Sequence, residues 1–342
     1  MEEKVRLSDI ASELGLSTAT VSYVLHGKTG MVSERTANRV RQALEERGYL
    51  PRAAEVLLAA NPAKIVGVVI NDHEKYEAHI LEDAFIASAL NALSAETARC
   101  GLQMMVKAVH DLNEIVSFAT MWNLEGLVLI GFCNADYKRL REHMRIPFVV
   151  YDACGAQTER TFAVNIDDRD GGRQVGEYFR RCGHRRALCL ADNDVDMDRE
   201  RWEGFRQGFG DGAEFWMIPM AKGERLAFYE ARLPALTAFT AIFAVSDYYA
   251  VELCHFLSAQ GVAVPEEVSV CGFDDTPLCA MVYPALTSVR QDTADRAKCA
   301  LDALRRLRAG EAVEPAITLS TSLVVRDSTR NRNTTLTTEY AG

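Results

Sequence analysis

From residue 64 onward, short apolar runs alternate with segments of helical periodicity, and this alternation restricts the possible folds more than any other feature. The apolar runs include IVGVVI, QMMVKAV, EGLVLIG and IPFVVYD, and after VNID they continue with RRALCLA, EFWMIPM, AIFAVSD and EVSVCGFDD. Helical patterns fall between them, for example in LNALSAETARC, GEYFRRCG and FYEARLPAL. Strands and helices that alternate through short links favour parallel sheets that are covered by helices on both faces. The sequence therefore predicts an α/β core of two parallel-sheet subdomains.

The length and composition indicate a multidomain globular protein. A chain of 342 residues exceeds one compact core, and 48% hydrophobic with 25% charged residues is ordinary for a globular protein. The first residues lack the apolar core of a signal peptide, and no stretch of eighteen residues is uninterruptedly apolar, so a soluble, cytoplasmic protein with no membrane partner is expected. Nine cysteines without ligand-like spacing predict reduced, mostly buried thiols and no metal site. No cofactor is expected.

The first fifty residues predict a separate unit of three helices. Ile10, Ala11 and Leu14 have helical spacing after the candidate cap Ser8, and Gly15 is suited to end that helix. Ser17 can cap a second helix that buries Val21, Val24 and Leu25 and leaves Thr18, Ala19, Ser22 and Tyr23 on the other face. Ser33 opens a third helix, whose apolar stripe is Val40, Ala43 and Leu44 and which ends at Gly48.

Such a unit is typical either of a helix-turn-helix DNA reader or of a small protein-interaction module. In a reader, the amino end of the second helix enters the major groove, where hydroxyl groups and small apolar side chains can contact base edges. The charge does not favour DNA. The whole chain has a net charge of -10, and residues 1–62 carry eight Lys and Arg against eight Asp and Glu.

The strings LSDIASELGLSTATVSYVLHGK and VSERTANRVRQALEERGYLP closely resemble the DNA-binding headpiece of the LacI/GalR family. This resemblance implies base reading by Thr18, Ala19 and Tyr23. It also implies DNA-backbone contacts by Ser17, Thr20, Ser22, Ser33 and Arg35. Tyr23 departs from the Arg that many members carry, which removes a bidentate guanine contact. His26 replaces a common Asn and is a candidate for either a phosphate contact or a helix cap.

Residues 51–62, which contain RAAEVLLAANP, are compatible with a short helix or with a simple linker. In the family, the matching segment forms a hinge helix on DNA, and a leucine from each subunit wedges into the minor groove; Leu58 occupies that position. Glu55 and Val56 replace the common Ala-Arg, which places an acid near phosphate groups and removes a cation.

Further strings resemble the LacI/GalR sensor, which is similar to periplasmic sugar-binding proteins. They are NIDDRDGGRQVGEYFRRCGHRR, RERWEGFRQGF, AIFAVSD, VPEEVSVCGFDD, PALTSVRQD and LVVRDST. By this resemblance Arg201 clamps ligand oxygens, Asp274 accepts hydrogen bonds from ligand hydroxyls, and Asp152 matches a third ligand position. Ser246 stands where an Asn is frequent. Trp202 is expected in the core.

Position after an apolar run also makes Asn71 and Asp72 candidates for effector binding, because ligands of parallel α/β folds bind beyond the carboxyl ends of strands. For any one of these polar residues, capping of the next helix is the alternative role. Charge-rich RDGGR and GHRR are expected to cap helices or form solvated faces, and His184 is expected to be structural.

Together these observations predict an α-helical helix-turn-helix headpiece over residues 1–50 and a hinge over 51–62. They also predict a periplasmic-binding-protein-like α/β core, with one subdomain over 63–163 and 291–322 and the other over 164–290 and 323–342. The expected function is that of a dimeric transcription regulator, by family default a repressor of carbohydrate-related genes. It would bind a pseudopalindromic double-stranded operator under the control of a sugar-like effector. The polar carboxyl end lacks the leucine heptads of a tetramerising helix.

Two alternatives compete with a regulator. A ligand sensor or solute-binding protein would bind DNA weakly or without specificity, but it would not need the headpiece. An enzyme could use the neighbouring Asp274 and Asp275, but side chains adjacent on an extended strand point in opposite directions and cannot easily flank one bond. No catalytic residue is therefore predicted.

Overall fold

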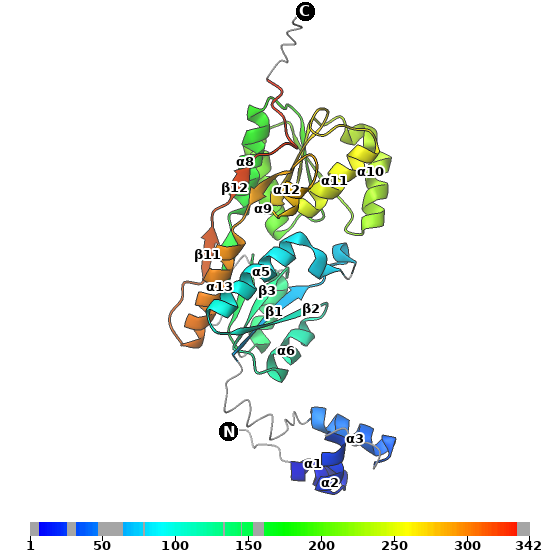
Figure 1. The fold of residues 1–342 in the computed structure, drawn as a ribbon, viewed down its shortest axis with the longest axis vertical. Helices are drawn as coiled ribbons and strands as arrows, with labels where there is room; N and C mark the ends of the chain where they lie inside the picture. Colours follow the sequence, from blue (N-terminus) through cyan, green and yellow to red (C-terminus); the bar gives the residue numbers. More distant parts are fainter. Residues whose placement is uncertain are drawn as a thin grey trace, which may run out of the picture. The chain divides into compact units, whose positions relative to one another are not determined.

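The structure is a computed structural model that describes residues 7–25, 32–46, 64–77, 79–132, 134–144, 146–152 and 161–333. The chain divides into two compact units, residues 1–63 and 64–342. Figure 1 shows the three helices of the first unit and the helices and strands of the second.

The first unit contains the three expected helices, α1 (Leu7–Leu14), α2 (Thr18–Leu25) and α3 (Glu34–Glu46). Their buried face is made of Ile10, Ala11, Val21, Val24, Ala37, Val40 and Ala43. Gly15 ends α1 with a φ of +66°, a conformation that favours glycine. Ser8 is not a cap as expected: it lies within α1, and its hydroxyl donates to Asp9. The expected end at Gly48 lies outside the described residues.

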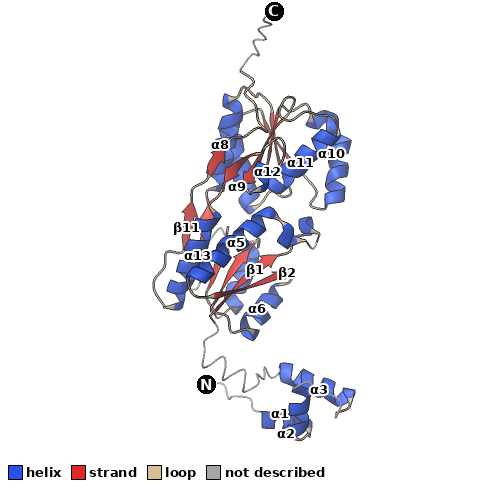
Figure 2. Cartoon of the chain, viewed as in Figure 1, coloured by secondary structure: helices blue, strands red, loops and turns tan. Residues whose placement is uncertain are grey.

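The second unit consists of two α/β subdomains (Figure 2). In the first subdomain the strand order is β11-β5-β4-β3-β1-β2, and all described pairings are parallel. Its strands are β1 (Ile65–Asn71), β2 (Gln103–Val109), β3 (Gly126–Ile130), β4 (Phe148–Tyr151), β5 (Thr161–Ile166) and β11 (Ala316–Leu319). Its helices are the short 3₁₀ turns η2 (Glu74–Tyr76) and η3 (Ile80–Glu82), followed by α5 (Ala84–Arg99), α6 (Leu112–Met121), α7 (Asn134–His143) and α13 (Thr293–Arg308).

The second subdomain has the order β12-β10-β9-β8-β6-β7, in which only the pairing of β10 with β12 is antiparallel among the described strands. Its strands are β6 (Ala187–Ala191), β7 (Ala213–Met217), β8 (Ala241–Ala244), β9 (Ser269–Asp274), β10 (Thr287–Arg290) and β12 (Ser322–Val324). Its helices are α8 (Asp168–Arg181), α9 (Asp196–Phe209), α10 (Lys222–Leu236), α11 (Asp247–Ala259) and α12 (Leu278–Met281).

Burial on both faces of the sheet explains why the strands read as continuous apolar runs. In β1, Val66, Val68 and Ile70 pack with α5 and α13, whereas Val69 packs on the opposite face with α6 and α7. Successive side chains of a strand point to opposite faces, so a sheet covered on both sides needs an apolar residue at every position. Burial of each such side chain contributes about 1.5–3 kcal/mol.

The chain crosses between the two sheets three times, after β5, after β10 and after β11. Strand β5 extends to Ile166 in the first sheet, and β12 begins at Ser322 in the second. The boundaries expected at 163/164 and 322/323 therefore fall inside these strands, because a strand belongs to the sheet it pairs with along its whole length. None of the helices in the described ranges combines the length and apolar composition that a membrane crossing requires.

Candidate effector cavity and DNA-facing helix

Helix α2 presents a polar face to solvent because its apolar residues are used in the core. Thr18, Ala19 and Tyr23 are exposed, whereas Val21 and Val24 are buried. The periodicity of an α-helix makes these two faces distinct. The exposed face is the one that the sequence predicts for base reading.

Serine hydroxyls begin both α2 and α3. The Ser17 hydroxyl oxygen accepts from the Thr20 amide at 3.1 Å, and that of Ser33 accepts from the Thr36 amide at 3.3 Å. A cap of this kind stabilises a helix by about 1 kcal/mol. Exposed Arg35 follows in the first turn of α3, and Ser22 is half-buried on α2. His26 and Leu58 lie outside the described residues.

A cavity of about 1000 Å³ lies between the two α/β subdomains, with walls from both. Its lining follows the carboxyl ends of β3, β4, β6, β8 and β9 and includes η2 and parts of α9, α10 and α11. Parallel sheets place ligand sites at this edge, where strand-following loops converge. Four of the six predicted effector residues line it: Asp152, Arg201, Ser246 and Asp274.

Arg201 is a buried cation at the cavity wall and is only 7% exposed. Its Nε donates to Asp168 Oδ1 at 2.7 Å and its Nη1 donates to the Val245 carbonyl at 2.6 Å. The guanidinium carbon lies 3.8 Å from the centre of the Phe273 ring. Burial raises the pKa of Asp168 to about 6 although Arg201 acts to lower it. These contacts use two of the five N–H groups, so Arg201 is held rigidly while it faces the cavity.

The carboxylates of Asp152 and Asp274 are joined by a chain of buried hydrogen bonds. Arg296 donates to Asp152 at 2.7 Å and to the Gln291 amide oxygen at 2.5 Å, and the Gln291 amide donates to Asp274 at 2.6 Å. Burial raises the pKa of Asp274 well above its ordinary value. Asp152 belongs to the first subdomain and Asp274 to the second, so this chain of bonds links the two halves of the cavity.

Two predicted effector residues do not line the cavity. The Asn71 amide donates to the Gly131 carbonyl at 3.0 Å, and Asp72 lies 3.2 Å from the His110 ring nitrogen. The lining begins only at His73, two residues after the end of β1, so neither Asn71 nor Asp72 is among the residues that border this cavity. Ser246 lines the cavity and also caps α11, since its hydroxyl accepts from the Tyr249 amide at 3.4 Å.

Several cavity residues were not predicted from the sequence. Lys75 and Tyr76 come from η2, Asp192 follows β6, and Asp198 lies in the first turn of α9. Asp192 follows an apolar run directly, which is the signal that identified the predicted effector residues. Lys75 and Tyr76 lie in η2, which has no apolar pattern that could have identified them. Gln291 appears in the string PALTSVRQD, but nothing local shows that it reaches Asp274.

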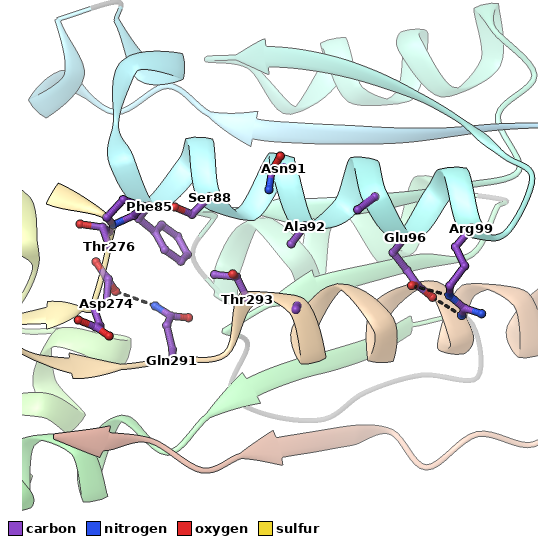
Figure 3. Close-up of a pocket in the computed structure, with 14 residues that line it drawn as sticks. Phe85, Ser88, Asn91, Ala92, Glu96, Arg99, Asp274, Thr276, Gln291 and Thr293 are labelled. Carbon is purple, nitrogen blue, oxygen red and sulfur yellow. Dashed lines mark hydrogen bonds and ion pairs between the residues drawn. The ribbon is translucent and has the colours of Figure 1, made fainter. Parts of the chain in front are cut away.

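A second cavity, of about 540 Å³, lies along α5 and the start of α13 (Figure 3). Phe85, Ser88 and Asn91 of α5 line it together with Thr276 and Thr293. Figure 3 also shows the bond from Gln291 to Asp274, so the same aspartate borders both cavities. The salt bridge between Glu96 and Arg99 lies at its far end.

The arrangement does not support hydrolysis by the neighbouring acids Asp274 and Asp275. Both acids border the smaller cavity, but Asp275 accepts a hydrogen bond from Arg290 at 2.6 Å and forms a salt bridge with Arg326 at 2.6 Å, so each of its oxygens faces an arginine. Asp275 also does not line the larger cavity, which Asp274 does. As expected, His184 is structural: it is buried, it bonds to Thr240 at 2.9 Å, and burial lowers its pKa to about 4.

Two other expectations from the sequence are confirmed. Trp202 packs against Phe205 and Phe215 in the core of the second subdomain. The seven described cysteines are free thiols, of which four are buried, two are half-buried and Cys100 is exposed.

Comparisons with known proteins give the same two-part division. Residues 6–52 match the family "Bacterial regulatory proteins, lacI family", and residues 177–329 match the family "Periplasmic binding protein-like domain". The chain is 27% identical to the HTH-type transcriptional regulator CelR of Thermobifida fusca, covering 96% of this chain and 100% of that protein. It is 24% identical to the HTH-type transcriptional repressor PurR of Vibrio parahaemolyticus, covering 96% and 99%.

Solved structures of similar fold include a complex of the transcriptional regulator CelR with cellobiose. It has a TM-score of 0.67 and 25% identity, and it covers 95% of this chain and 100% of that one. The lac repressor dimer bound to operator and an anti-inducer also has a TM-score of 0.67, with 22% identity and coverage of 96% and 100%. The latter likeness concerns the fold alone.

Proposed function

The chain belongs to the LacI family of DNA-binding transcription regulators, which are not enzymes, and from this premise we propose that it represses carbohydrate-related genes as an effector-controlled homodimer. The observation that carries the proposal is that one chain combines a helix, α2, that exposes Thr18, Ala19 and Tyr23, with a cavity between two α/β subdomains in which charged side chains stand among apolar ones. Such a protein acts on the chromosome, and hence in the cytoplasm.

For DNA recognition, the exposed face of α2 supplies the base contacts. Thr18 and Ala19 lie at its amino end and meet base edges first, while Tyr23 lies more than one turn farther along. Ser17, Thr20, Ser22, Ser33 and Arg35 supply contacts to phosphate and sugar, together with His26. In the hinge, Leu58 wedges into the minor groove at the operator centre.

For effector recognition, the cavity offers hydrogen-bonding groups from both subdomains. Arg201 supplies donors, while Asp152, Asp274 and Ser246 supply oxygen atoms that accept from ligand hydroxyls. This combination suits a small polyhydroxylated molecule such as a sugar or a sugar derivative. Because opposite walls belong to different subdomains, an occupant changes their relative position and thereby the fit of two headpieces to the operator.

For dimerisation, the second unit exposes apolar side chains at and beside α12. Met281 is 78% exposed, Tyr283 is 98% exposed and Leu278 is 38% exposed. Leu81 of η3, in the first subdomain, is also exposed, at 55%. Large exposed apolar groups of this kind usually mark an interface, and a second copy of the chain is the partner that a pseudopalindromic operator requires.

The proposal is tested by selecting genomic DNA fragments bound by the purified protein, with and without a panel of sugars, nucleosides and related metabolites. One palindromic motif, weakened or strengthened by one class of compound, is expected. Tyr23→Ala should weaken binding to that motif by about 1–3 kcal/mol and relax its sequence preference, while Tyr23→Phe separates the ring from the hydroxyl. Salt-sensitive binding without a motif would instead favour a ligand sensor that has lost specific DNA recognition.

A further inference from the structure

The effector cavity carries a large excess of acidic side chains. Its described lining contains ten carboxylates, Glu77, Glu82, Asp83, Asp152, Asp192, Asp196, Asp198, Asp247, Glu252 and Asp274, and three Lys or Arg side chains, Lys75, Arg201 and Lys222. Arg296 and Arg225, which do not line the cavity, pair with Asp152 and Glu252. Burial also raises the pKa values of Asp198, Asp247 and Asp274. When these three acids and the two pairs are set aside, five acids still face three cations in the lining. Such a field repels an anionic ligand and attracts a cation.

Two of these acids form a close pair at the end of β6 and the start of α9. The Asn193 side-chain amide donates both to Asp192 Oδ1 at 2.6 Å and to Asp198 Oδ2 at 2.9 Å. The Tyr249 hydroxyl donates to the other oxygen of Asp192 at 2.5 Å. Two carboxylates gathered around one amide repel each other when both are ionised, so the pair favours either a shared proton or a nearby cation.

A cation from the other subdomain already occupies this corner. The Lys75 ammonium lies 4.9 Å from the centre of the Tyr76 ring and 5.7 Å from that of Tyr249. Tyr249 is also the residue that donates to Asp192, and the charges of Asp192 and Asp198 act to raise the pKa of Lys75, so the ammonium lies near an aromatic ring and in the field of the acid pair. This is the chemistry that binds ammonium groups.

The lysine reaches across the cavity to this position. Lys75 belongs to η2 of the first subdomain, whereas the acid pair and Tyr249 belong to the second. The Tyr248 hydroxyl also donates to the Lys75 main-chain carbonyl at 3.4 Å, which ties the same turn to α11. A ligand that took the place of the ammonium would therefore change a contact between the subdomains as well as filling the cavity.

We propose that the effector is a polyhydroxylated molecule with a protonated amine, similar to an amino sugar, whose nitrogen displaces the Lys75 ammonium beside Asp192, Asp198 and Tyr249. The inference rests on the proposed function, because it assigns a ligand class to the same cavity. Arg201 and Asp274 remain available for the hydroxyl groups. Displacement of the Lys75 ammonium removes one contact between η2 and the second subdomain and leaves the bond from Tyr248 to the Lys75 carbonyl, so binding of the amine changes how the two halves are joined.

The test compares sugars that differ only in the charged group. Calorimetric titration of the full-length protein at pH 7 would use glucose, glucosamine and glucuronate, and the corresponding galactose and mannose series. In at least one series, the amine is expected to bind at least about tenfold more tightly than its neutral and acidic counterparts. A difference of this size corresponds to the free energy of a hydrogen bond to a charged group. A neutral or acidic member that binds best, or no binding by any amine, overturns the proposal.

Variants locate the amine within the cavity. Asp198→Asn should weaken amine binding about tenfold or more, and Lys75→Met should strengthen it, because the competing ammonium is gone. Asp194→Asn is the matched control, since Asp194 is an exposed neighbour that faces Arg199 and does not line the cavity. Equal weakening by both Asp→Asn changes, or weaker amine binding in Lys75→Met, contradicts the assignment. An operator motif that responds only to neutral sugars would reject the amine and leave the proposed regulator intact.

Discussion

Individual side chains set the chemistry of the cavity, and Asp198 is the clearest case. Burial, and next the charge of Asp192, raise its pKa to about 7 from an ordinary 3.8, although Arg201 and Lys75 act to lower it. The folded protein therefore holds a proton at Asp198 that the unfolded chain releases near pH 4. The stability that this proton contributes is complete below about pH 4 and is lost as the pH rises through about 7.

Asp198→Asn removes this pH dependence, because an amide keeps the neutral form at every pH. At pH 8 the variant should melt about 2–4 °C above the unchanged protein, which corresponds to roughly 1 kcal/mol in a unit of this size, and the difference should vanish toward pH 4. Thermal melts across pH 4–8 measure it, with Asp194→Asn as control. The opposite result, in which Asp198→Asn melts below the unchanged protein at pH 8, would show that the fold favours the charged form of Asp198.

The close packing of α8 against α9 depends on glycines, and it fixes the position of Arg201 at the cavity wall. A side-chain carbon at Gly172 would collide with the Arg201 carbonyl, and one at Gly204 would collide with the Arg169 carbonyl. The two helices therefore touch backbone to backbone, which only residues without a side chain permit. This packing accounts for the second glycine of RDGGR, whereas a side-chain carbon at the first, Gly171, would collide with the Phe273 ring.

Gly204→Ala should force α8 and α9 apart and lower the free energy of unfolding by about 2 kcal/mol or more, within the range of overpacked cores. Effector affinity should fall too, because Arg201 lies one turn away. Melting and titration measure both effects. The control is Gly223→Ala in α10, where an added carbon meets nothing within 4 Å, and it should be neutral or stabilise by up to about 1 kcal/mol. Equal effects of the two substitutions would rule out the packing explanation.

At the scale of the whole molecule, dimerisation through the second unit would determine how strongly the first unit binds the operator. Met281→Asp places a charge among the exposed apolar side chains beside α12 and should convert a dimer into a monomer in sedimentation experiments. Its operator affinity should fall by at least about tenfold, because one headpiece then binds alone. Met217→Asp is matched in residue type and is also exposed, at 61%, but it lies at the end of β7; it should remain dimeric. A monomeric unchanged protein, or a stable tetramer, would reject the predicted dimer.

Local patterns in the sequence were enough to predict the strands and helices on which the function depends. The apolar runs of β1, β3 and β6 and the serine caps of α2 and α3 arise from interactions between residues close along the chain, which periodicity and capping chemistry describe. The same patterns, with the family resemblance, identified Asp152, Arg201, Ser246 and Asp274, which line the cavity.

The composition of the cavity depends on contacts that no local pattern contains. Asn71 and Asp72 follow an apolar run but do not line the cavity, whereas Lys75, in a turn without an apolar pattern, reaches the Tyr249 ring of the second subdomain. Arg296 reaches Asp152 from a position 144 residues later in the chain. The sequence by itself therefore determined the elements and the strand ends that could hold a site. Only the packing of distant strands and helices selected which side chains meet there, because their approach depends on the whole fold and not on neighbouring residues.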